Sequence, residues 1–395
     1  MLIDNFIEKG KKYLYTDDQK KVQKERFKAV IETTKHQIEK CGLYRQLCKQ
    51  KNFDPRRDLK SVDDIKNIPY LTSANYKGKT GTPKKFLCVP ESEIQVWQSS
   101  SGTSGDPSLI GKDKINLQRY LKVLNFSYAE VLNLAHFDWT LFFTPRPQKL
   151  YTIEDKITDP IRSMLYVMIL TNKAPLENRI YALKMADEES MKKGKLFDID
   201  SEGTLSFLNA NPSEKGKGWI SGSIPLLYSF FSEIYKKTGQ TFECGEDSVV
   251  VVGGGWKSFS GEQVPPEKFR DTLSKSLGIP QKNIRDSYNF SETDCMNPEC
   301  EYHNKHVLPW QDIIIRDVET LEPVEMGETG LVNVINPIAY SYAGVSILQD
   351  DIAKITMEDN CSCGRRGKII EIIGRAQGAE GKGCGVQLAG ETDNN

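Results

Sequence analysis

Apolar side chains recur at intervals of three and four residues in two parts of the chain. Within residues 1 to about 50, Phe27, Val30, Ile31 and Ile38 keep the spacing of one helical face. Apolar positions repeat in the same way over residues 117–132, which predicts an amphipathic helix packed on a core. We therefore expect helices in both places, the first serving as scaffold.

Short runs rich in β-branched and aromatic residues predict strands. Residues 139–144 and 248–252 have the content of buried strands. The last third of the chain turns β-rich, with strands expected at 312–317, 330–335 and 346–351. Strands that alternate with helices predict an α/β architecture, and the β-rich end predicts a small β subdomain.

The composition narrows the class of protein. A chain of 395 residues is long enough for two or three subdomains that share one site. Its 53 basic and 54 acidic residues nearly cancel, which argues against nucleic acid or an anionic membrane as partner and favours a small-molecule substrate. No basic, apolar leader begins the chain and no apolar run reaches about 18 residues, so we expect a cytoplasmic protein without a membrane span. The nine cysteines are then expected to be thiols, ligands or nucleophiles.

A stretch rich in hydroxyl side chains and glycine follows Gln98. Glycines let the backbone approach an anion, successive N–H groups bind it, and hydroxyls add donors, so the stretch predicts a phosphate loop. The spacing of a Walker A loop is absent, and a flexible linker of the same composition is the alternative. The residues expected to contact phosphate are Ser100, Ser101, Gly102, Thr103, Ser104 and Gly105.

Three other segments offer groups for a nucleotide. Gly253–Gly255 follow a predicted strand, where exposed backbone can seat a flat ligand, although a tight turn has the same sequence. Residues 288–294 combine an aromatic ring, hydroxyls and carboxylates that could stack a base, hold phosphate and bind Mg²⁺. Asp350 and Asp351 could accept from two ribose hydroxyls, or form a solvated turn.

The order of these motifs resembles that of the adenylate-forming enzymes, which activate a carboxylate with ATP. Residues 316–330, with the pattern Arg-Asp-x-x-Thr-x-Glu-Pro-Val-x-x-Gly-Glu-x-Gly, and the pair Gly374-Arg375 complete that order. Within the superfamily, the run Gly-Gly-Gly-Trp-Lys and the ending at Cys384 are most similar to the acyl-protein synthetases of the bioluminescence fatty-acid reductase complex. Phenylacetate-CoA ligases are close relatives, and the resemblance covers roughly residues 60–388.

This resemblance implies an α/β adenylate-forming domain of two lobes plus a small β subdomain. We expect a helical extension at 1–60, a catalytic domain at 61–375 with the β subdomain at about 300–375, and a tail at 376–395. It assigns the phosphates to the Ser/Gly loop, with Ser291 and Thr293 nearby. The remaining assignments are Gly253, Gly254 and Gly255 to the adenine wall, Tyr288 to stacking on adenine, Glu292 to Mg²⁺, Asp351 to ribose, and Arg375 to ribose and phosphate.

The loop departs from the family pattern after Pro107, where a lysine is common and this chain has Ser108. The missing positive charge could come from Lys112 or Lys257 instead. Asp350 likewise stands where the family usually has glycine.

The end of the chain departs from superfamily members that carry a swinging C-terminal domain. Only twenty residues follow Gly374-Arg375. Acyl-protein synthetases share this short ending, and in them a cysteine accepts the acyl group; Cys384 matches it. Glycines around Cys384 could let its thiol swing, and Lys382 could lower its pKa. An idle thiol in a frayed tail is the alternative.

Cysteines and histidines gather in two short segments. Cys295, Cys300, His303 and His306 lie within a dozen residues, and Cys361 and Cys363 return later. Thiolate and imidazole donors at such spacing predict a zinc site, although the clustering could be fortuitous. Similarity to phenylacetate-CoA ligase relatives selects Cys300, His306, Cys361 and Cys363, with Cys295 or His303 as possible replacements. Four protein ligands leave no open position, so the role would be structural.

We therefore expect an enzyme that makes acyl-AMP from a fatty or aryl acid with ATP and Mg²⁺. The acyl group would pass to Cys384 and a partner reductase, or directly to CoA or a carrier protein. Lys257 and Arg375 would assist. A nucleotide-binding protein without turnover and a zinc hydrolase are the other hypotheses. Candidate residues of the acid pocket are Phe142, Phe143, Tyr228, Phe230 and Trp256, most of which could equally be core.

Overall fold

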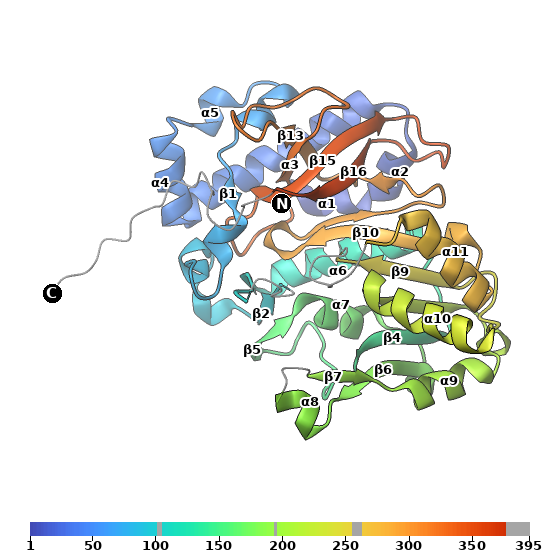
Figure 1. Ribbon diagram of the computed structural model, residues 1–395. Coiled ribbons are helices and arrows are strands. Elements are labelled where there is room, and N and C mark those ends of the chain that lie inside the picture. Colours follow the sequence, from blue (N-terminus) through green and yellow to red (C-terminus); the bar gives the residue numbers. More distant parts are fainter. Residues whose placement is uncertain (101–104, 193–195, 255–262, 377–395) are drawn as a thin grey trace.

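A seven-stranded, mostly parallel sheet forms the larger part of the molecule. The computed structural model describes residues 1–100, 105–192, 196–254 and 263–376 (Figure 1). The strand order is β11-β10-β9-β8-β4-β6-β7, and only the two edge strands, β11 and β7, run antiparallel to their neighbours. The strands are β4 (Trp139–Pro145), β6 (Arg179–Met185), β7 (Phe197–Ile199), β8 (Gly218–Gly222), β9 (Val249–Gly253), β10 (Ile284–Phe290) and β11 (Cys295–Pro298).

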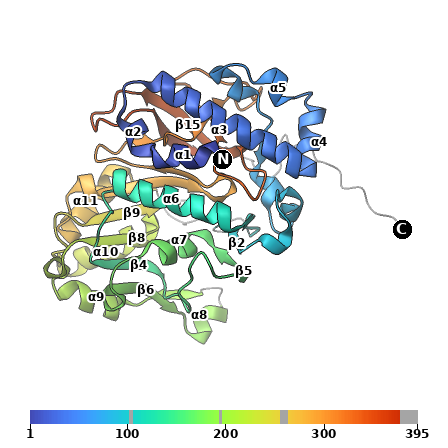
Figure 2. The ribbon, with the colours of Figure 1, turned by 180° about the vertical axis from the view of Figure 1, so that it is seen from behind.

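Helices cover both faces of this sheet, as parallel strands require. Figure 1 shows α10 (Ile224–Thr238) and α11 (Pro266–Leu277) on one face, and Figure 2 shows α6 (Lys114–Glu130) and α7 (Ser163–Thr171) on the other. Each pair packs its apolar side chains on the strands in a separate buried cluster. The shorter helices α8 (Glu188–Lys192) and α9 (Ser201–Asn209) lie near the β6 and β7 edge.

The β-rich end of the chain forms a second sheet. Its strand order is β12-β16-β15-β14-β13, and β1 pairs parallel with β15 although about 275 residues separate them. The strands are β1 (Leu71–Thr72), β12 (Lys305–His306), β13 (Asp312–Arg316), β14 (Gly330–Ile335), β15 (Ser346–Glu358) and β16 (Lys368–Arg375).

N-terminal helices pack on this second sheet, as Figure 2 shows for α3. Arg26 of α3 forms an ion pair with Asp312 of β13 at 3.1 Å, and the buried Gln37 donates to the carbonyl of Ala339 at 2.9 Å. The helices therefore belong to the core of this half of the molecule. They are α1 (Leu2–Glu8), α2 (Gly10–Tyr15), α3 (Gln19–Lys40), α4 (Gly42–Gln50) and α5 (Pro55–Asp58).

A small third sheet has the order β3-β2-β5, with β2 (Val96–Ser99), β3 (Leu109–Lys112) and β5 (Ile157–Arg162). The strands β2 and β3 form an antiparallel pair, so the predicted phosphate loop is the connection of a hairpin. Short 3-10 helices complete the chain: Val62–Asn67, Ser73–Tyr76, Pro83–Phe86, Glu91–Glu93, Leu176–Asn178, Pro212–Lys215, Gln281–Asn283 and Ser291–Thr293.

The mixed α/β architecture confirms the predicted fold class, and α6, β4, β9, β13, β14 and β15 stand where the sequence pattern predicts them. A short strand, β3, lies between the predicted phosphate loop and α6. No helix in the described ranges is both long and apolar enough to cross a membrane.

Candidate active site

A cavity of about 890 Å³ opens where the carboxyl ends of β4, β8, β9 and β10 face the second sheet. Ligands of open α/β sheets bind at this edge, because the loops that follow the strands diverge there. One part of the cavity is lined by hydroxyl, amide and charged groups, and another part by apolar side chains.

The described ends of the phosphate loop border the polar part. Ser99 and Ser100 line the cavity. The backbone N–H of Ser100 donates to the carbonyl of Ser108 at 3.0 Å, and the N–H of Ser108 donates to Oγ of Ser100 at 2.9 Å, which closes the neck of the loop. Gly105 has φ +78°, a left-handed conformation that favours glycine. Ser101, Gly102, Thr103 and Ser104 lie outside the described residues.

Lys112 does not supply the positive charge that the loop lacks. Its side chain is fully buried, forms an ion pair with Asp294 and donates to Oε1 of Gln98 at 2.5 Å. Burial lowers the pKa of Lys112, and the Asp294 carboxylate opposes that shift. Lys112 is absent from the cavity wall, so the expectation that it contacts phosphate is corrected. Lys257 lies outside the described residues.

The end of β9 borders the cavity through Gly253 and Gly254. Gly254 has φ +86° and an open space where a Cβ would stand, so this backbone is exposed to a ligand. The third residue assigned to the adenine wall, Gly255, lies outside the described residues.

Alternation along β10 turns the ring of Tyr288 away from the cavity. Ser287 and Asn289 line the cavity, as does Phe290 at the end of the strand, whereas Tyr288 packs in an apolar cluster and is not part of the wall. The hydroxyl of Tyr288 donates to Oδ2 of Asp351 at 2.9 Å, and burial raises the pKa of this tyrosine well above its usual range. The structure thus gives Tyr288 a contact with Asp351 in place of the expected stacking face.

Asp351 and Arg375 lie side by side at the polar end of the cavity. They are register partners in β15 and β16, and Nε of Arg375 donates to Oδ1 of Asp351 at 3.3 Å. Both line the cavity, Asp351 buried and Arg375 with about half of its side chain exposed. The arrangement leaves the guanidinium room to contact a ligand.

The turn after β10 presents Ser291 and Glu292 to the cavity. Oγ of Ser291 lies 3.0 Å from Oγ of Ser163, at the start of α7. Glu292 is buried, and no described residue donates a hydrogen bond to its carboxylate, so its oxygens can take a cation. Thr293 is different: its hydroxyl donates to the carbonyl of Gly344 at 2.6 Å, and the residue does not line the cavity.

The apolar part of the cavity lies between α6, α7 and the sheet. Its wall includes Leu124, Tyr128, Val167, Met168 and Trp219. Of the five aromatic residues expected there, the four that the structure describes are absent from the wall. Phe142, Phe143 and Phe230 are buried in the packing of the helices on the sheet, Tyr228 packs against the same core, and Trp256 lies outside the described residues.

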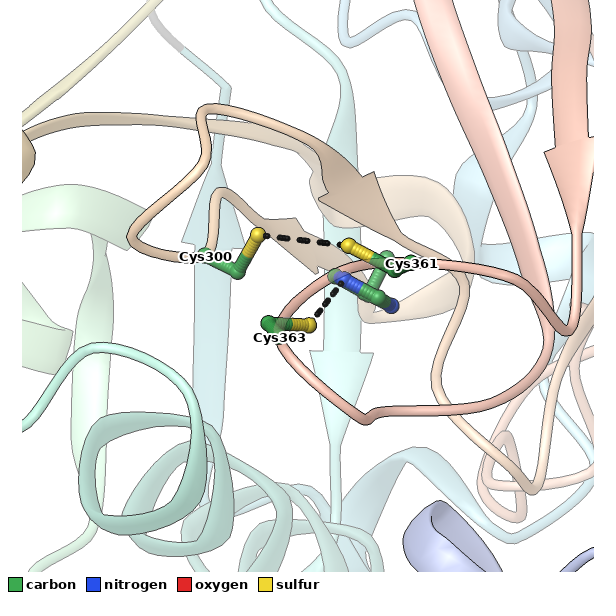
Figure 3. A group of neighbouring side chains, drawn as sticks. Cys300, Cys361 and Cys363 are labelled. Atoms are coloured by element: carbon green, nitrogen blue, oxygen red, sulfur yellow. Dashed lines mark hydrogen bonds between the residues drawn. The ribbon is translucent and has the colours of Figure 1, made fainter.

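A second group of functional side chains lies outside the cavity. The ligand atoms of Cys300, His306, Cys361 and Cys363 all lie within 4.8 Å of one another. Figure 3 shows the three cysteines pointing toward a common centre, with Sγ of Cys300 3.8 Å from Sγ of Cys361. The loop after β11, β12 and the turn between β15 and β16 supply them. These are the four residues that the resemblance selects.

Nearby N–H groups donate hydrogen bonds to two of the cysteine sulfurs. The backbone N–H of Tyr302 donates to Sγ of Cys300 at 3.4 Å, and the side chain of Asn304 donates to Sγ of Cys361 at 3.3 Å. Such N–H donors stabilise thiolates in metal sites. The alternative ligands point elsewhere, because Sγ of Cys295 accepts from Asn297 and Nδ1 of His303 faces Glu299 at 3.6 Å.

Several cavity residues have no counterpart in the motif analysis, among them Ser73, Lys77 and Gln349. They come from the pairing of β1 with β15, which sets Thr72 beside Leu348. A two-residue strand leaves no periodic pattern, so the sequence carries no signal for this pairing.

Comparison with known proteins identifies the family. The family model described as "Acyl-protein synthetase, LuxE" matches residues 2–392. A long-chain-fatty-acid–luciferin-component ligase of Vibrio harveyi is 26% identical over 88% of this chain and 82% of its own length. A phenylacetate-coenzyme A ligase of Thermus thermophilus is 27% identical over 27% of this chain and 23% of its own length, a more distant likeness.

The fold resembles that of a solved 2-hydroxyisobutyryl-CoA ligase in complex with 2-HIB-AMP and CoA. The TM-score is 0.62 with 16% identity, over 92% of this chain and 70% of that one. This likeness confirms the predicted adenylate-forming fold. The chain belongs to the LuxE family of acyl-protein synthetases, enzymes that activate a carboxylic acid as an acyl-adenylate and transfer the acyl group to a thiol.

Proposed function

We propose that this chain activates a long-chain fatty acid with Mg²⁺ and ATP in the 890 Å³ cavity and then carries the acyl group on Cys384. The observation that carries the proposal is that one cavity joins a polar wall, with Glu292, Asp351 and Arg375, to an apolar wall between α6 and α7. A nucleotide suits the first wall and an alkyl chain the second. The name of the Vibrio harveyi relative supports the fatty-acid substrate.

In this scheme the carboxylate end of the acid meets the α-phosphate where the two walls join. Asp351 would accept from ribose hydroxyls, and Arg375 beside it would contact ribose and phosphate. Ser100, Gly105 and the loop between them would donate to phosphate oxygens. Gly253 and Gly254 would form the adenine wall. These contacts hold the reacting atoms in line, which is the main requirement of transfer at phosphorus.

The residue that would hold Mg²⁺ is Glu292. Its carboxylate is buried beside the cavity and accepts no hydrogen bond from the described residues, which fits a cation-binding role. A divalent cation in this position would supply positive charge to the phosphate oxygens. Ser291, held 3.0 Å from Ser163, would fix the turn that presents Glu292.

After adenylation the thiolate of Cys384 would attack the acyl carbonyl carbon and AMP would leave, forming a thioester. A partner reductase would receive the acyl group from this thioester. The alternative is that a carrier protein or CoA accepts the acyl group directly. The resemblance in fold to a CoA ligase is consistent with this alternative. Cys384 lies outside the described residues, so an acylation experiment is needed to choose between these acceptors.

The test is intact-protein mass after incubation with Mg²⁺-ATP and a pool of fatty and aryl acids, with AMP measured on the same sample. We expect a hydroxylamine-labile adduct whose mass identifies the acid and which Cys384→Ser abolishes. Cys244→Ser is the matched control, because Cys244 is buried in the core. AMP without an adduct would favour an external thiol. The absence of both AMP and an adduct with every acid in the pool would contradict adenylation.

We also propose that Cys300, His306, Cys361 and Cys363 hold a structural Zn²⁺. The grouping of three sulfurs and one imidazole nitrogen within 4.8 Å supports this, since these donors suit tetrahedral zinc. None of the four lines the cavity, which argues against a zinc-dependent hydrolase. We further propose that the chain divides into a helical scaffold at 1–60, a catalytic unit at 61–375 and a tail at 376–395.

A further inference from the structure

A second cavity, of about 750 Å³, lies on the other side of β1 from the candidate active site. The end of α4, the helix α5, the segment 66–72 and the turn after β13 form its wall. Strand β1 runs between the two cavities, because Thr72 lines the second and the next residue, Ser73, lines the first. None of the residues that line the second cavity takes part in the proposed reaction.

Arg316, the last residue of β13 and the first of the motif at 316–330, is a buried cation on this wall. It is only 5% exposed and forms no ion pair with a described residue. Its Nε donates to Oδ1 of Asn333 at 2.9 Å, and its terminal nitrogens donate to the carbonyls of Leu321 at 3.0 Å and Lys66 at 2.6 Å. An arginine has five N–H donors, so two have no acceptor among the described residues. Because a buried charge without a counter-ion is costly, an anion in the cavity would be stabilised there.

Two lysines on the same wall add positive charge. Lys51 and Lys66 are exposed, and neither forms an ion pair within the described part of the chain. Of the two acidic residues on the wall, Asp58 is paired with Arg57 at 2.7 Å, which leaves Glu322. With four cationic and two acidic side chains, the wall carries a net formal charge of +2.

Apolar side chains line another part of the second cavity, among them Phe53, Ile68 and Leu71. The guanidinium of Arg316 lies over the ring of Tyr70, 5.1 Å from its centroid, so the cationic and apolar parts of the wall adjoin. Such a wall suits an anion that carries an apolar body. A phosphate monoester has nearly two negative charges at neutral pH and so matches the net charge of the wall, whereas a carboxylate has one.

We propose that the second cavity is a binding site for an organic phosphate monoester, with Arg316, Lys51 and Lys66 as donors to the phosphate oxygens. The two spare N–H groups of Arg316 supply the buried contact, and the lysines neutralise the outer oxygens. The apolar body of the ligand packs against Phe53 and Leu71. This site is separate from the proposed nucleotide site, and the inference does not depend on the proposed function.

The test is calorimetric titration of the full-length protein with phenyl phosphate and with hexyl phosphate. The double variant Lys51→Ala, Lys66→Ala should weaken binding at least tenfold, because two charged donors are lost from an exposed part of the wall. The matched control is Lys20→Ala, Lys24→Ala, which removes two exposed lysines of α3 and should bind like the wild type. Tighter binding of phenyl phosphate would identify an aryl body, and tighter binding of hexyl phosphate an alkyl body.

Acetylation of lysines followed by peptide mass analysis locates the bound probe. Phenyl phosphate should protect Lys51 and Lys66, but not Lys49, an exposed lysine of α4 outside the wall. Arg316→Lys keeps the charge and loses the forked donors, so it should bind about tenfold more weakly. If Arg316→Lys does not fold, the double lysine variant decides, because its two side chains are exposed.

Three results would overturn the inference. The first is binding by the double lysine variant within twofold of the wild type. The second is no binding of either probe at millimolar concentration. The third is loss of binding in Arg375→Ala with full binding in the double lysine variant, which would assign the probe to the candidate active site.

Discussion

The hydroxyl of Tyr288 donates to Oδ2 of Asp351 at 2.9 Å and joins the end of β10 in the first sheet to β15 in the second. A hydrogen bond to an ionised partner is worth about 1.5–3 kcal/mol. Because burial raises the pKa of Tyr288 well above its usual range, the hydroxyl remains a donor at neutral pH. The orientation of the proposed ribose-binding carboxylate therefore depends on the junction between the sheets.

Tyr288→Phe should raise the KM for ATP about three- to tenfold, since Asp351 loses one of the two donors that orient it. Steady-state pyrophosphate exchange measures the KM, with Tyr235→Phe, an exposed tyrosine of α10, as the control. An unchanged KM in Tyr288→Phe would show that Arg375 alone orients Asp351.

Lys112→Met should destabilise the protein by about 3–5 kcal/mol, because it leaves the buried Asp294 carboxylate without its ion-pair partner. The double variant Lys112→Met, Asp294→Asn should recover part of this loss, since no unpaired charge remains. Urea unfolding of the two single variants and the double variant gives the free energies. Additive losses in the double variant would mean that the pair is not coupled.

Stability in acid should depend on Asp312. Burial by itself raises the pKa of this carboxyl, but Arg26 and Lys368 hold it below its usual range. Because the folded pKa is the lower one, the carboxylate stabilises the fold above its unfolded pKa of about 4, and the contribution is lost as the pH falls through the folded pKa. Asp312→Asn should be less stable at pH 7 and vary less between pH 5 and pH 2.

Urea unfolding across this pH range measures the effect. Asp63→Asn, which changes an exposed aspartate, is the control and should follow the wild type. If Asp312→Asn kept the full acid dependence of the wild type, other carboxyls would have to account for it.

The purified protein should contain about one zinc per chain, measured by elemental analysis. Cys361→Ser and His306→Ala should lose zinc and unfold at lower temperature, because metal binding and folding are coupled in such sites. Cys295→Ser and His303→Ala, which change the two neighbouring candidates, should keep the metal. Retention of zinc by Cys361→Ser would place the metal elsewhere.

The length of acid accepted should depend on the wall between α6 and α7. Val167→Phe should shift pyrophosphate exchange toward shorter acids, because the larger ring fills part of the apolar end of the cavity. A series of saturated acids measures the profile. Phe143→Leu is the control, since Phe143 packs on α10 in a different cluster, and it should leave the profile unchanged. The reverse result would restore the original assignment of Phe143 to the pocket.

The parts of the fold that could be predicted have a strong local pattern. The 3.6-residue repeat of α6 and the apolar run of β9 each report a buried face directly. The region from about 175 to 247 gave no such signal, although β6, α9, β8 and α10 lie in it. Short elements with mixed faces owe their conformation to tertiary packing more than to local sequence.

The residues of the candidate site likewise fall into those that a local sequence motif predicts and those that it does not. Residues in contiguous motifs, such as Glu292 and the glycines after β9, do reach the cavity. Tyr288 shares a motif with Glu292 yet faces the core, because strand alternation decides its direction. Ser73 and Gln349 reach the cavity from segments that the pairing of β1 with β15 brings together, and no local pattern in the sequence predicts a pairing across about 275 residues.

Strand β15 connects the cavity wall to the cysteine cluster, and its residue register sets the direction of side chains in both places. Gln349 and Asp351 are two residues apart on this strand, both line the cavity, and seven residues further the strand ends just before Cys361. Deleting one residue between Ser346 and Gln349 would reverse the direction of the side chains on one side of the deletion relative to those on the other. The hydrogen-bonded ladder could survive such a slip while the cavity-facing groups and the cysteines were no longer in phase, so β15 is a point where we expect a single deletion to inactivate a folded enzyme.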